Sequence, residues 1–261
     1  MNERFKGQVA VITGGASGIG LACAELLAEQ GARVAVADID ESNAIKVAES
    51  LGGRGYALDV SVAGDVEAVA QRIEEELGPV TMLVNAAGIL QGAAVPPEEV
   101  PMQTFDRIYE VNLRGAYAVC VAFGLRMGTR GNGAIVNFGS IAAIRSTPLH
   151  AYGPLKAAIL RLTENLSAEW GPKGVRVNCV SPGPVLTPPM QDAINKGLRD
   201  RKRMEDSAAM GRIVLPREVA LTVAFLLSED ASAVTGVNLP VDNGWLVADS
   251  WAFFGGLRKP D

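Results

Sequence analysis

Short runs of apolar and β-branched residues alternate with longer segments of helical periodicity along the whole chain. Each run is nearly continuous in apolar character, which is typical of a strand buried on both faces of a parallel sheet. We predict seven such strands, near residues 8–13, 32–37, 54–58, 80–84, 133–138, 174–180 and 236–241.

The segments between these runs repeat apolar residues at helical spacing. They predict helices near residues 18–30, 41–51, 62–77, 98–127, 151–170 and 216–228, with a further helical pair near 187–210. Strands that alternate with helices join through right-handed crossovers, so the expected fold is α/β: a doubly wound Rossmann fold with a seven-stranded parallel sheet flanked by helices. No linker or repeat divides the sequence, and residues 1–261 should form a single domain.

Composition and charge exclude several classes of function. The 261 residues carry a net charge of −5, and their lysines and arginines form no cluster large enough to indicate a nucleic-acid partner. Residues 1–6 are charged, and no later stretch offers the roughly 18 uninterrupted apolar residues that a membrane span needs. We therefore expect a cytoplasmic protein that binds neither nucleic acid nor a membrane.

The cysteines are odd in number, widely spaced and set in apolar runs, at Cys23, Cys120 and Cys179. This arrangement indicates buried thiols rather than disulfides or metal ligands. No metal site is expected.

A glycine-rich segment, residues 13–20, follows the first predicted strand and opens the first predicted helix. Its glycines would let the backbone turn tightly and approach a pyrophosphate at the helix N-terminus, where free N–H groups favour an anion. A plain strand-to-helix turn is the alternative. The candidate cofactor-binding residues of this loop are Gly14, Ser17, Gly18, Ile19 and Gly20.

An acidic residue, Asp38, ends the second predicted strand, about 20 residues beyond the loop, where a carboxylate accepts hydrogen bonds from the adenosine ribose. The same carboxylate would repel the 2′-phosphate of NADP. Asp38 could also cap the following helix, and the two roles are compatible. The expected cofactor is NAD.

Tyr152 and Lys156 are four residues apart and share one face of the helix predicted near 151–170. A free tyrosine has a pKa of about 10, so it is a weak base at neutral pH unless a positive charge stabilises its phenolate. Lys156 would supply that charge, and Ser140 would hold the substrate oxygen. The pair alone would indicate only a helix face, but its context favours a site that takes a proton from an alcohol while a dinucleotide takes the hydride.

The motifs follow one another in a fixed order, namely the glycine loop, Asn-Ala-Ala-Gly at 85–88, Ser140, Tyr152 with Lys156, and Pro182 with Gly183. In this order the chain resembles the classical short-chain dehydrogenase/reductase family over about residues 7–245. The resemblance implies an NAD-dependent oxidoreductase that interconverts a secondary alcohol and a ketone. The substrate would be of the polyol, sugar, hydroxy acid or hydroxysteroid type.

The resemblance also assigns roles that residue type alone leaves open. Asn112, which could be an ordinary core asparagine, would join Ser140, Tyr152 and Lys156 as the fourth member of the catalytic group and help to hold a water for proton relay. Further cofactor contacts are implied for Asp59, Val60, Asn85, Ala86, Gly88, Tyr152, Lys156, Pro182, Gly183 and Thr187.

Some of these implied contacts have alternatives. Asp59 could cap a helix, and residues 85–88 could form a tight packing turn. The cofactor preference is reinforced, because Ser17 and Ile39 stand where NADP-binding relatives carry a basic residue.

The stretch between Ser140 and Tyr152 contains eleven residues, one fewer than most relatives carry. We expect the two side chains to converge nevertheless, because each is placed by its own element. The candidate substrate-contacting residues are Gln91, Ser140, Ser146, His150 and Met190. His150 could instead be a rim or structural residue.

Two segments near the C-terminus have their own expectations. Residues 187–211 correspond to a mobile lid in relatives, and their charges should form a solvated helix face. Residues 245–261 form a tail that is too short for a core of its own, yet it carries the aromatic residues Trp245, Trp251, Phe253 and Phe254. Such a patch favours a partner surface, and this end lies at subunit contacts in relatives, so a homotetramer is expected.

Other functions compete with this interpretation. A 3-oxoacyl-type carbonyl reductase normally uses NADPH, which Asp38 disfavours. A non-catalytic NAD-binding redox sensor would have no need to keep the four catalytic-type residues together. An epimerase or dehydratase of the extended relatives would need a longer C-terminal substrate domain than this sequence has.

Overall fold

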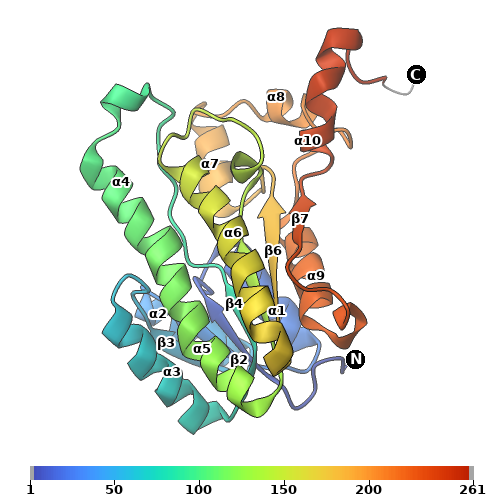
Figure 1. The fold of residues 1–261 in the computed structure, drawn as a ribbon. Helices are drawn as coiled ribbons and strands as arrows, with labels where there is room; N and C mark the ends of the chain where they lie inside the picture. Colours follow the sequence, from blue (N-terminus) through green and yellow to red (C-terminus); the bar gives the residue numbers. More distant parts are fainter. Residues whose placement is uncertain (1–2, 259–261) are drawn as a thin grey trace.

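The computed structural model describes residues 3–258. Its centre is a parallel sheet of seven strands in the order β3-β2-β1-β4-β5-β6-β7 (Figure 1). The strands are β1 (Val9–Thr13), β2 (Arg33–Asp38), β3 (Arg54–Ala57), β4 (Val80–Asn85), β5 (Gly133–Phe138), β6 (Val175–Pro182) and β7 (Asn238–Val241). The predicted fold class is confirmed, and each strand boundary lies within two residues of the expected one.

Helices join the strands. The α-helices are α1 (Gly18–Glu29), α2 (Glu41–Ser50), α3 (Ala63–Leu77), α4 (Met102–Tyr109), α5 (Ala116–Arg130), α6 (Tyr152–Trp170), α7 (Pro188–Asn195), α8 (Arg201–Asp206), α9 (Pro216–Leu227) and α10 (Trp245–Ala248). Short 3-10 turns are η1 (Pro97–Glu99), η3 (Ile141–Ala143), η4 (Gly171–Lys173), η5 (Glu229–Ala231) and η6 (Asp249–Phe254). The expected helical pair near 187–210 is confirmed as α7 and α8.

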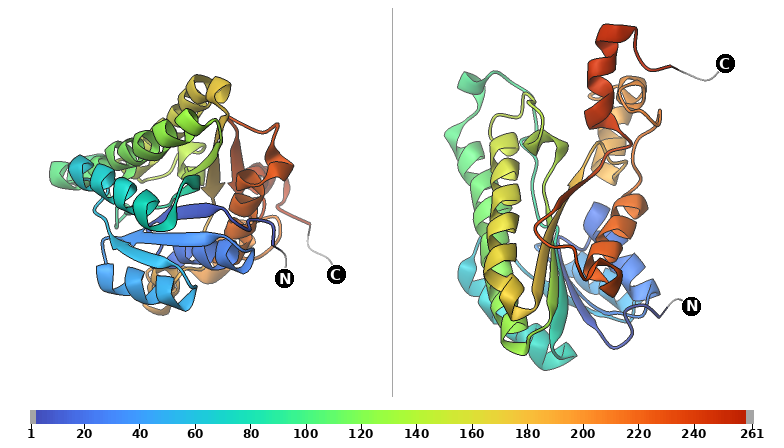
Figure 2. Two further views of the ribbon diagram at one scale, coloured as in Figure 1. Left: turned by 90° about the horizontal axis from the view of Figure 1, so that it is seen from below. Right: turned by 45° about the vertical axis from the view of Figure 1, so that its right-hand side comes forward.

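The two faces of the sheet bury separate cores, because successive side chains of a strand point to opposite sides. Ala10 and Ile12 of β1 pack with α1, α2 and α9. Val9 and Val11 pack on the opposite face with α3, α5 and α6. Figures 1 and 2 show these two helix layers on either side of the sheet. The predicted burial of the cysteine thiols is confirmed, and all three are free.

The helix expected over residues 98–127 is interrupted, so that prediction is wrong in extent. Pro101 is extended, with φ −62° and ψ 137°, and α4 begins only after it. Proline lacks an N–H and disfavours helix in the residue before it, so a single helix cannot run through this point. Between α4 and α5, Glu110–Gly115 forms a π-helical turn, η2, of a kind that is frequent at functional sites.

The C-terminal tail projects from the body of the molecule beyond β7 (Figures 1 and 2). It consists of α10 and η6, and Phe253 and Phe254 in it are 94% and 86% exposed. In residues 3–258 no helix has both the length and the apolar character needed to cross a membrane.

Candidate active site

Two cavities meet at the edge of the sheet where the strands end at their carboxyl termini. The first, the loop cavity, is lined by the glycine loop and by the ends of β2 and β3. The second, the tyrosine cavity, is lined by the start of α6 and by the segments after β5 and β6. The two cavities form one cleft, because they share Ile19, Ala86, Gly88, Ile89, Leu90 and Thr187. Doubly wound sheets bind ligands at this edge, where the strand order reverses.

The glycine loop is shaped by positions that leave no room for a side chain. Gly14 has a φ of 63°, and a Cβ there would lie 2.8 Å from the Cα of Ala87. A Cβ on Gly20 would lie 2.1 Å from the carbonyl oxygen of Gly14. Ser17 is the N-cap of α1, but its exposed side chain makes no capping hydrogen bond. The Ser17 hydroxyl and the first N–H groups of α1 are therefore available to an anion in the loop cavity.

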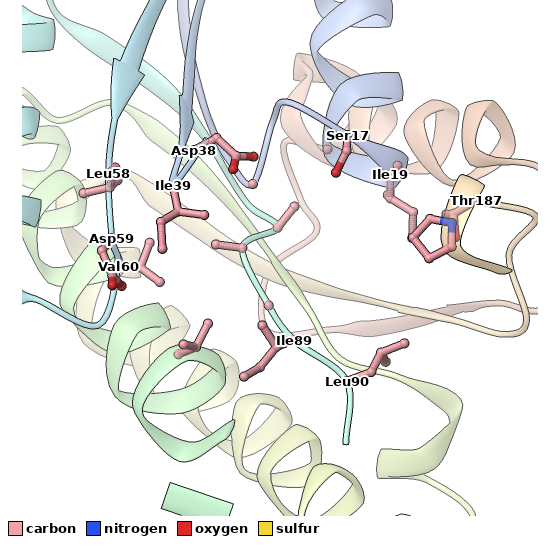
Figure 3. A pocket seen from close by; sticks show the side chains of 18 of the residues that line it. Ser17, Ile19, Asp38, Ile39, Leu58, Asp59, Val60, Ile89, Leu90 and Thr187 are labelled. Atoms are coloured by element: carbon pink, nitrogen blue, oxygen red, sulfur yellow. The ribbon is translucent and has the colours of Figure 1, made fainter. Parts of the chain in front are cut away.

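Asp38 borders the loop cavity at the end of β2, as Figure 3 shows. Its Oδ2 accepts a 3.1 Å hydrogen bond from the N–H of Ala16, and its Oδ1 accepts one of 3.1 Å from the N–H of Asp40. These bonds fix the carboxylate between β2 and the glycine loop. The N-cap of α2 is Asp40 rather than Asp38, so the capping alternative is wrong. Ile39 lies at the cavity rim and is 68% exposed.

Asp59 and Val60 line the end of the loop cavity beyond β3 (Figure 3). Asp59 accepts hydrogen bonds of 2.6 Å from the hydroxyl and 2.9 Å from the N–H of Ser61. Its Oδ2 also lies 3.5 Å from Nη2 of Arg107. These interactions, the Ser61 hydroxyl first, lower the pKa of Asp59. Arg107 lines the same cavity and donates a 2.8 Å hydrogen bond to the Ser61 hydroxyl.

The segment 85–88 approaches both cavities through Ala86 and Gly88, while Asn85 points into the interior. The Asn85 side chain accepts a 3.2 Å hydrogen bond from the Thr13 hydroxyl and donates one of 3.2 Å to Oδ1 of Asn137. Asn85 thus links β1, β4 and β5 beneath the cleft. Asn85 does not line either cavity, so the structure gives it the role of supporting the segment 86–88 and not the implied direct contact with the cofactor.

Asn112 lies in η2 and is buried. Its Oδ1 accepts a 2.8 Å hydrogen bond from the N–H of Ile89, and its Nδ2 donates one of 2.8 Å to the Ile89 carbonyl. Both halves of the amide therefore hold the wall of the cleft in place. A Cβ on Gly88 would lie 3.4 Å from Oδ1 of Asn112 and 3.8 Å from Nζ of Lys156, so the three residues converge.

Ser140 and Tyr152 converge at the tyrosine cavity, as expected despite the short loop between them. Ser140 caps η3, and its hydroxyl accepts a 3.1 Å hydrogen bond from the N–H of Ala142. Tyr152 is the first residue of α6. Burial raises the pKa of Tyr152, and a side-chain hydrogen bond with Ser140 opposes this rise.

Lys156 lies one helical turn after Tyr152 and is buried. Its Nζ donates a 2.8 Å hydrogen bond to the carbonyl of Phe138 and lies 5.6 Å from the centre of the Tyr152 ring. Burial lowers the pKa of Lys156 to about 8. Burial raises the pKa of Tyr152, and the interaction that opposes this rise is with Ser140 and not, as the sequence predicted, with Lys156.

The remaining lining of the tyrosine cavity comes from the segment after β6 and from the lid. Pro182 and Gly183 border it, and a Cβ on Gly183 would lie 2.8 Å from the Cβ of Asp242. Thr187 borders both cavities, and Figure 3 shows it among the residues of the loop cavity. Met190, a substrate candidate, lines the tyrosine cavity.

Gln91, another substrate candidate, is 9% exposed and supports the start of α6 instead of lining the cavity. Its Oε1 accepts hydrogen bonds of 2.8 Å from the N–H of Ala151 and 3.4 Å from the N–H of Tyr152. The predicted contact of Gln91 with substrate is therefore not supported, because its amide turns towards the backbone at the start of α6.

Ser146 and His150 line a neighbouring cavity. This cavity shares Ala142 and Leu149 with the tyrosine cavity, so the loop between Ser140 and Tyr152 separates the two. The loop turns these two candidates away from Tyr152, and their contact with substrate is not supported.

Sequence reasoning missed two arginines of the cleft, Arg107 and Arg199. Arg107 borders the loop cavity and Arg199 borders the tyrosine cavity. Both occur in segments rich in charged residues, where an exposed side chain is the usual outcome. No local pattern distinguishes them from their neighbours.

Comparison with known proteins agrees with this geometry. Residues 14–246 match the family model described as enoyl-(acyl carrier protein) reductase. The chain is 38% identical to D-threitol dehydrogenase of Mycolicibacterium smegmatis over 258 residues, which cover 94% of this chain and 95% of that protein.

Two solved structures are similar throughout. A Brucella melitensis protein described as ribose-5-phosphate isomerase is 49% identical with a TM-score of 0.96, covering 99% of this chain and 100% of that chain. A structure of NAD⁺-bound xylitol dehydrogenase is 33% identical with a TM-score of 0.85, covering 91% of this chain and 98% of that chain.

Proposed function

Because the chain belongs to the short-chain dehydrogenase/reductase family, we propose that it is an NAD-dependent alcohol dehydrogenase that interconverts a secondary alcohol and a ketone. The observation that carries this proposal is that Ser140, Tyr152 and Lys156 line or border one cavity, which is continuous with a second cavity walled by the glycine loop. The cavity geometry suits a hydride donor and acceptor held side by side.

The chemistry follows from the residues of the tyrosine cavity. When bound, NAD supplies the acceptor for the hydride. The Ser140 hydroxyl holds the substrate oxygen next to Tyr152, whose phenolate takes the hydroxyl proton. The alcohol loses this proton together with a hydrogen and its electron pair from the carbinol carbon, so the product is a ketone. The reverse reduction uses the same groups.

Tyr152 needs positive charge nearby, because burial disfavours its phenolate. Lys156, with a pKa of about 8, is mostly charged at neutral pH and lies close to the ring. Asn112 holds the adjacent wall through Ile89 and would help to order the water through which Lys156 passes the proton outward.

The preference for NAD over NADP is part of the proposal and is supported by Asp38. Its carboxylate is fixed by two backbone N–H groups at the rim of the loop cavity. A ribose hydroxyl could donate to that carboxylate, whereas a 2′-phosphate would face its charge. Ile39, the next residue, offers no cation to offset this repulsion.

Three alternatives are less well supported. A 3-oxoacyl-type reductase would be expected to use NADPH, against the charge of Asp38. A redox sensor has no use for the converged Ser140, Tyr152 and Lys156. An isomerase, as the Brucella melitensis protein is described, leaves the overall oxidation state of its substrate unchanged. Such a reaction does not require the cavity beside the glycine loop that could hold a dinucleotide.

The deciding experiment mixes the protein with NAD or NADP and a panel of polyols, sugars, hydroxy acids and hydroxysteroids, and follows the absorbance of reduced cofactor. Reduction of NAD equal to the ketone formed is the expected result, and Tyr152→Phe is the control. Formation of ribulose 5-phosphate from ribose 5-phosphate without cofactor, with no reduction of NAD by any compound, would replace the proposal with an isomerase.

We also propose that the chain assembles as a homotetramer. The support is the exposed apolar tail, in which Trp251 is 45% exposed and the two following phenylalanines are almost fully exposed. Exposed aromatic side chains of this size are usually covered by a partner surface.

A further inference from the structure

We infer that the substrate of this dehydrogenase carries an oxyanion group, and that Arg199 binds this group at the mouth of the tyrosine cavity. The inference rests on the proposed function and names its substrate class. Arg199 belongs to the loop between α7 and α8, in a segment whose charges the sequence assigned to a solvated helix face. The structure instead brings this arginine to the cavity that holds Ser140 and Tyr152.

The charge of the tyrosine cavity favours an anion. Its lining within residues 3–258 contains two basic side chains, Lys156 and Arg199, and no carboxylate. Lys156 is already engaged, because it is buried and donates to the Phe138 carbonyl. Arg199 is the exposed cation of the pair and is the one that a substrate group can reach.

Arg199 also differs from three other cations of its segment. Lys196, Arg201 and Lys202 form ion pairs of 2.7, 2.8 and 2.9 Å with carboxylates four residues away in the sequence. Arg199 has no such partner among the residues that the structure describes, and its hydrogen bond to the Leu198 carbonyl is 3.5 Å long. Its guanidinium therefore keeps donors free for a planar oxyanion, which an arginine can bind with two parallel hydrogen bonds.

The rest of the lining argues against a substrate with many hydroxyls. Most side chains around Ser140 and Tyr152 are apolar, including Ile89, Phe138 and Met190. A polyol would bury several hydroxyls there with few partners, and an unpaired buried hydroxyl weakens binding. The lining fits a secondary alcohol on a mainly apolar body, with the oxyanion at the end remote from the reacting carbon.

The test uses a series of hydroxy acids in which the carboxylate is one carbon further from the alcohol at each step: 3-hydroxybutanoate, 4-hydroxypentanoate and 5-hydroxyhexanoate. Each acid is paired with its neutral amide, and a sulfonate and a phosphate of matching length distinguish between oxyanions. We expect kcat/KM with NAD to favour the best acid over its amide by roughly tenfold or more, mainly through KM. The preference should weaken as salt is raised.

Variants separate a binding role from a structural one. Arg199→Gln should lower kcat/KM for the acid by roughly tenfold and lower it much less for the amide, so that the preference for the acid is lost, and Arg199→Lys should restore part of this preference. Lys196→Gln, which alters a paired cation of the same segment, should leave both values unchanged.

Several outcomes would overturn the inference. Equal use of acids and amides, or better use of threitol and xylitol than of any acid, would leave the dehydrogenase proposal standing and remove the anionic substrate. An equal loss for acid and amide in Arg199→Gln would assign Arg199 a structural role. Failure of every compound to reduce NAD would instead refute the proposed function, and the inference with it.

Discussion

Gln91 and Tyr152 are joined through the backbone: the side-chain oxygen of Gln91 accepts a 3.4 Å hydrogen bond from the N–H of Tyr152 and a shorter one of 2.8 Å from Ala151. Ala151, the N-cap of α6, makes no side-chain cap of its own. A residue from the segment after β4 therefore satisfies the first N–H groups of the helix that carries Tyr152.

Replacing Gln91 with leucine should lower both stability and turnover. We expect a loss of about 1 kcal/mol in the free energy of unfolding, as for other lost caps. A small displacement of Tyr152 should lower kcat by roughly 10-fold to 100-fold. Thermal unfolding and steady-state kinetics measure the two effects, and Gln71→Leu on the exposed face of α3 is the matched control.

Gln91→Glu separates positioning of Tyr152 from simple stabilisation. The glutamate keeps the acceptor but places negative charge beside Tyr152, which should raise the pKa of the phenol further. The rise of kcat/KM with pH should then move to higher pH, and kcat should recover in alkaline buffer. An unshifted pH profile would show that Gln91 has only a structural role.

Tyr152→Phe should abolish turnover while leaving NAD binding nearly intact. In the proposed mechanism the lost hydroxyl acts in proton transfer, and general acid–base groups typically contribute about 10²–10⁴ in rate. Cofactor binding can be followed by calorimetry on the same preparation. Near-normal kcat in this variant would falsify the role of Tyr152.

Lys156→Met should change how stability depends on pH. The pKa of Lys156 is lowered from its ordinary value of 10.5 to about 8 in the folded protein, so between these values the unfolded chain binds more protons than the folded one. The free energy of unfolding therefore rises with pH between these two values. The contribution of Lys156 is fully present above pH 10.5 and is lost as the pH falls to about 8.

The wild-type protein should therefore gain stability relative to Lys156→Met as pH rises from 7 towards 10. Thermal unfolding of both proteins across this range measures the difference, and other titrating groups cancel because both proteins contain them. A difference in Tm that does not change with pH would contradict the lowered pKa. The variant should also lose turnover, because Tyr152 would have no cation beside it.

Asp38→Ser combined with Ile39→Arg should shift cofactor use from NAD towards NADP. The change removes the carboxylate proposed to face the ribose and adds a cation at an exposed position of the loop cavity. Each tenfold change in preference corresponds to about 1.4 kcal/mol, so a hundredfold change in the ratio of kcat/KM values is a reasonable expectation. If the wild-type enzyme already uses both cofactors equally, or if the double change leaves the ratio unaltered, Asp38 does not set the cofactor preference. Its role would then be its hydrogen bonds with Ala16 and Asp40.

Deleting residues 247–261 should disturb assembly or the Michaelis constant before it disturbs the core of the sheet. The deleted segment includes the exposed Phe253 and Phe254 but leaves Leu246, whose carbonyl accepts a hydrogen bond of 2.6 Å from Arg145. Analytical ultracentrifugation measures the assembly, and Met102→Ser serves as a control at another exposed apolar residue. Unchanged sedimentation and an unchanged Michaelis constant would show that the tail contributes neither to assembly nor to substrate affinity.

The sequence alone determined the features that depend on near neighbours. The apolar runs predicted all seven strands. Burial on both faces selects apolar residues in the inner strands, whereas the edge strands β3 and β7 are partly exposed and were found from shorter runs. The glycine loop and the four-residue spacing of Tyr152 and Lys156 were equally readable, since a turn and one face of a helix are set within a few residues. The interrupted helix was missed, although Pro101 was a local signal for its boundary.

The tertiary structure decided which side chains meet across long distances in the chain. Gln91 is separated from Ala151 by 60 residues in sequence, and only packing of the segment after β4 against α6 turns its amide towards that helix. Likewise, Ser146 and His150 lie close to Tyr152 in sequence, yet the loop directs them into a neighbouring cavity. Arg199 resembles its paired neighbours until the fold of its segment places it at the cleft. Such contacts depend on how whole elements pack, and periodicity along the chain carries no information about them.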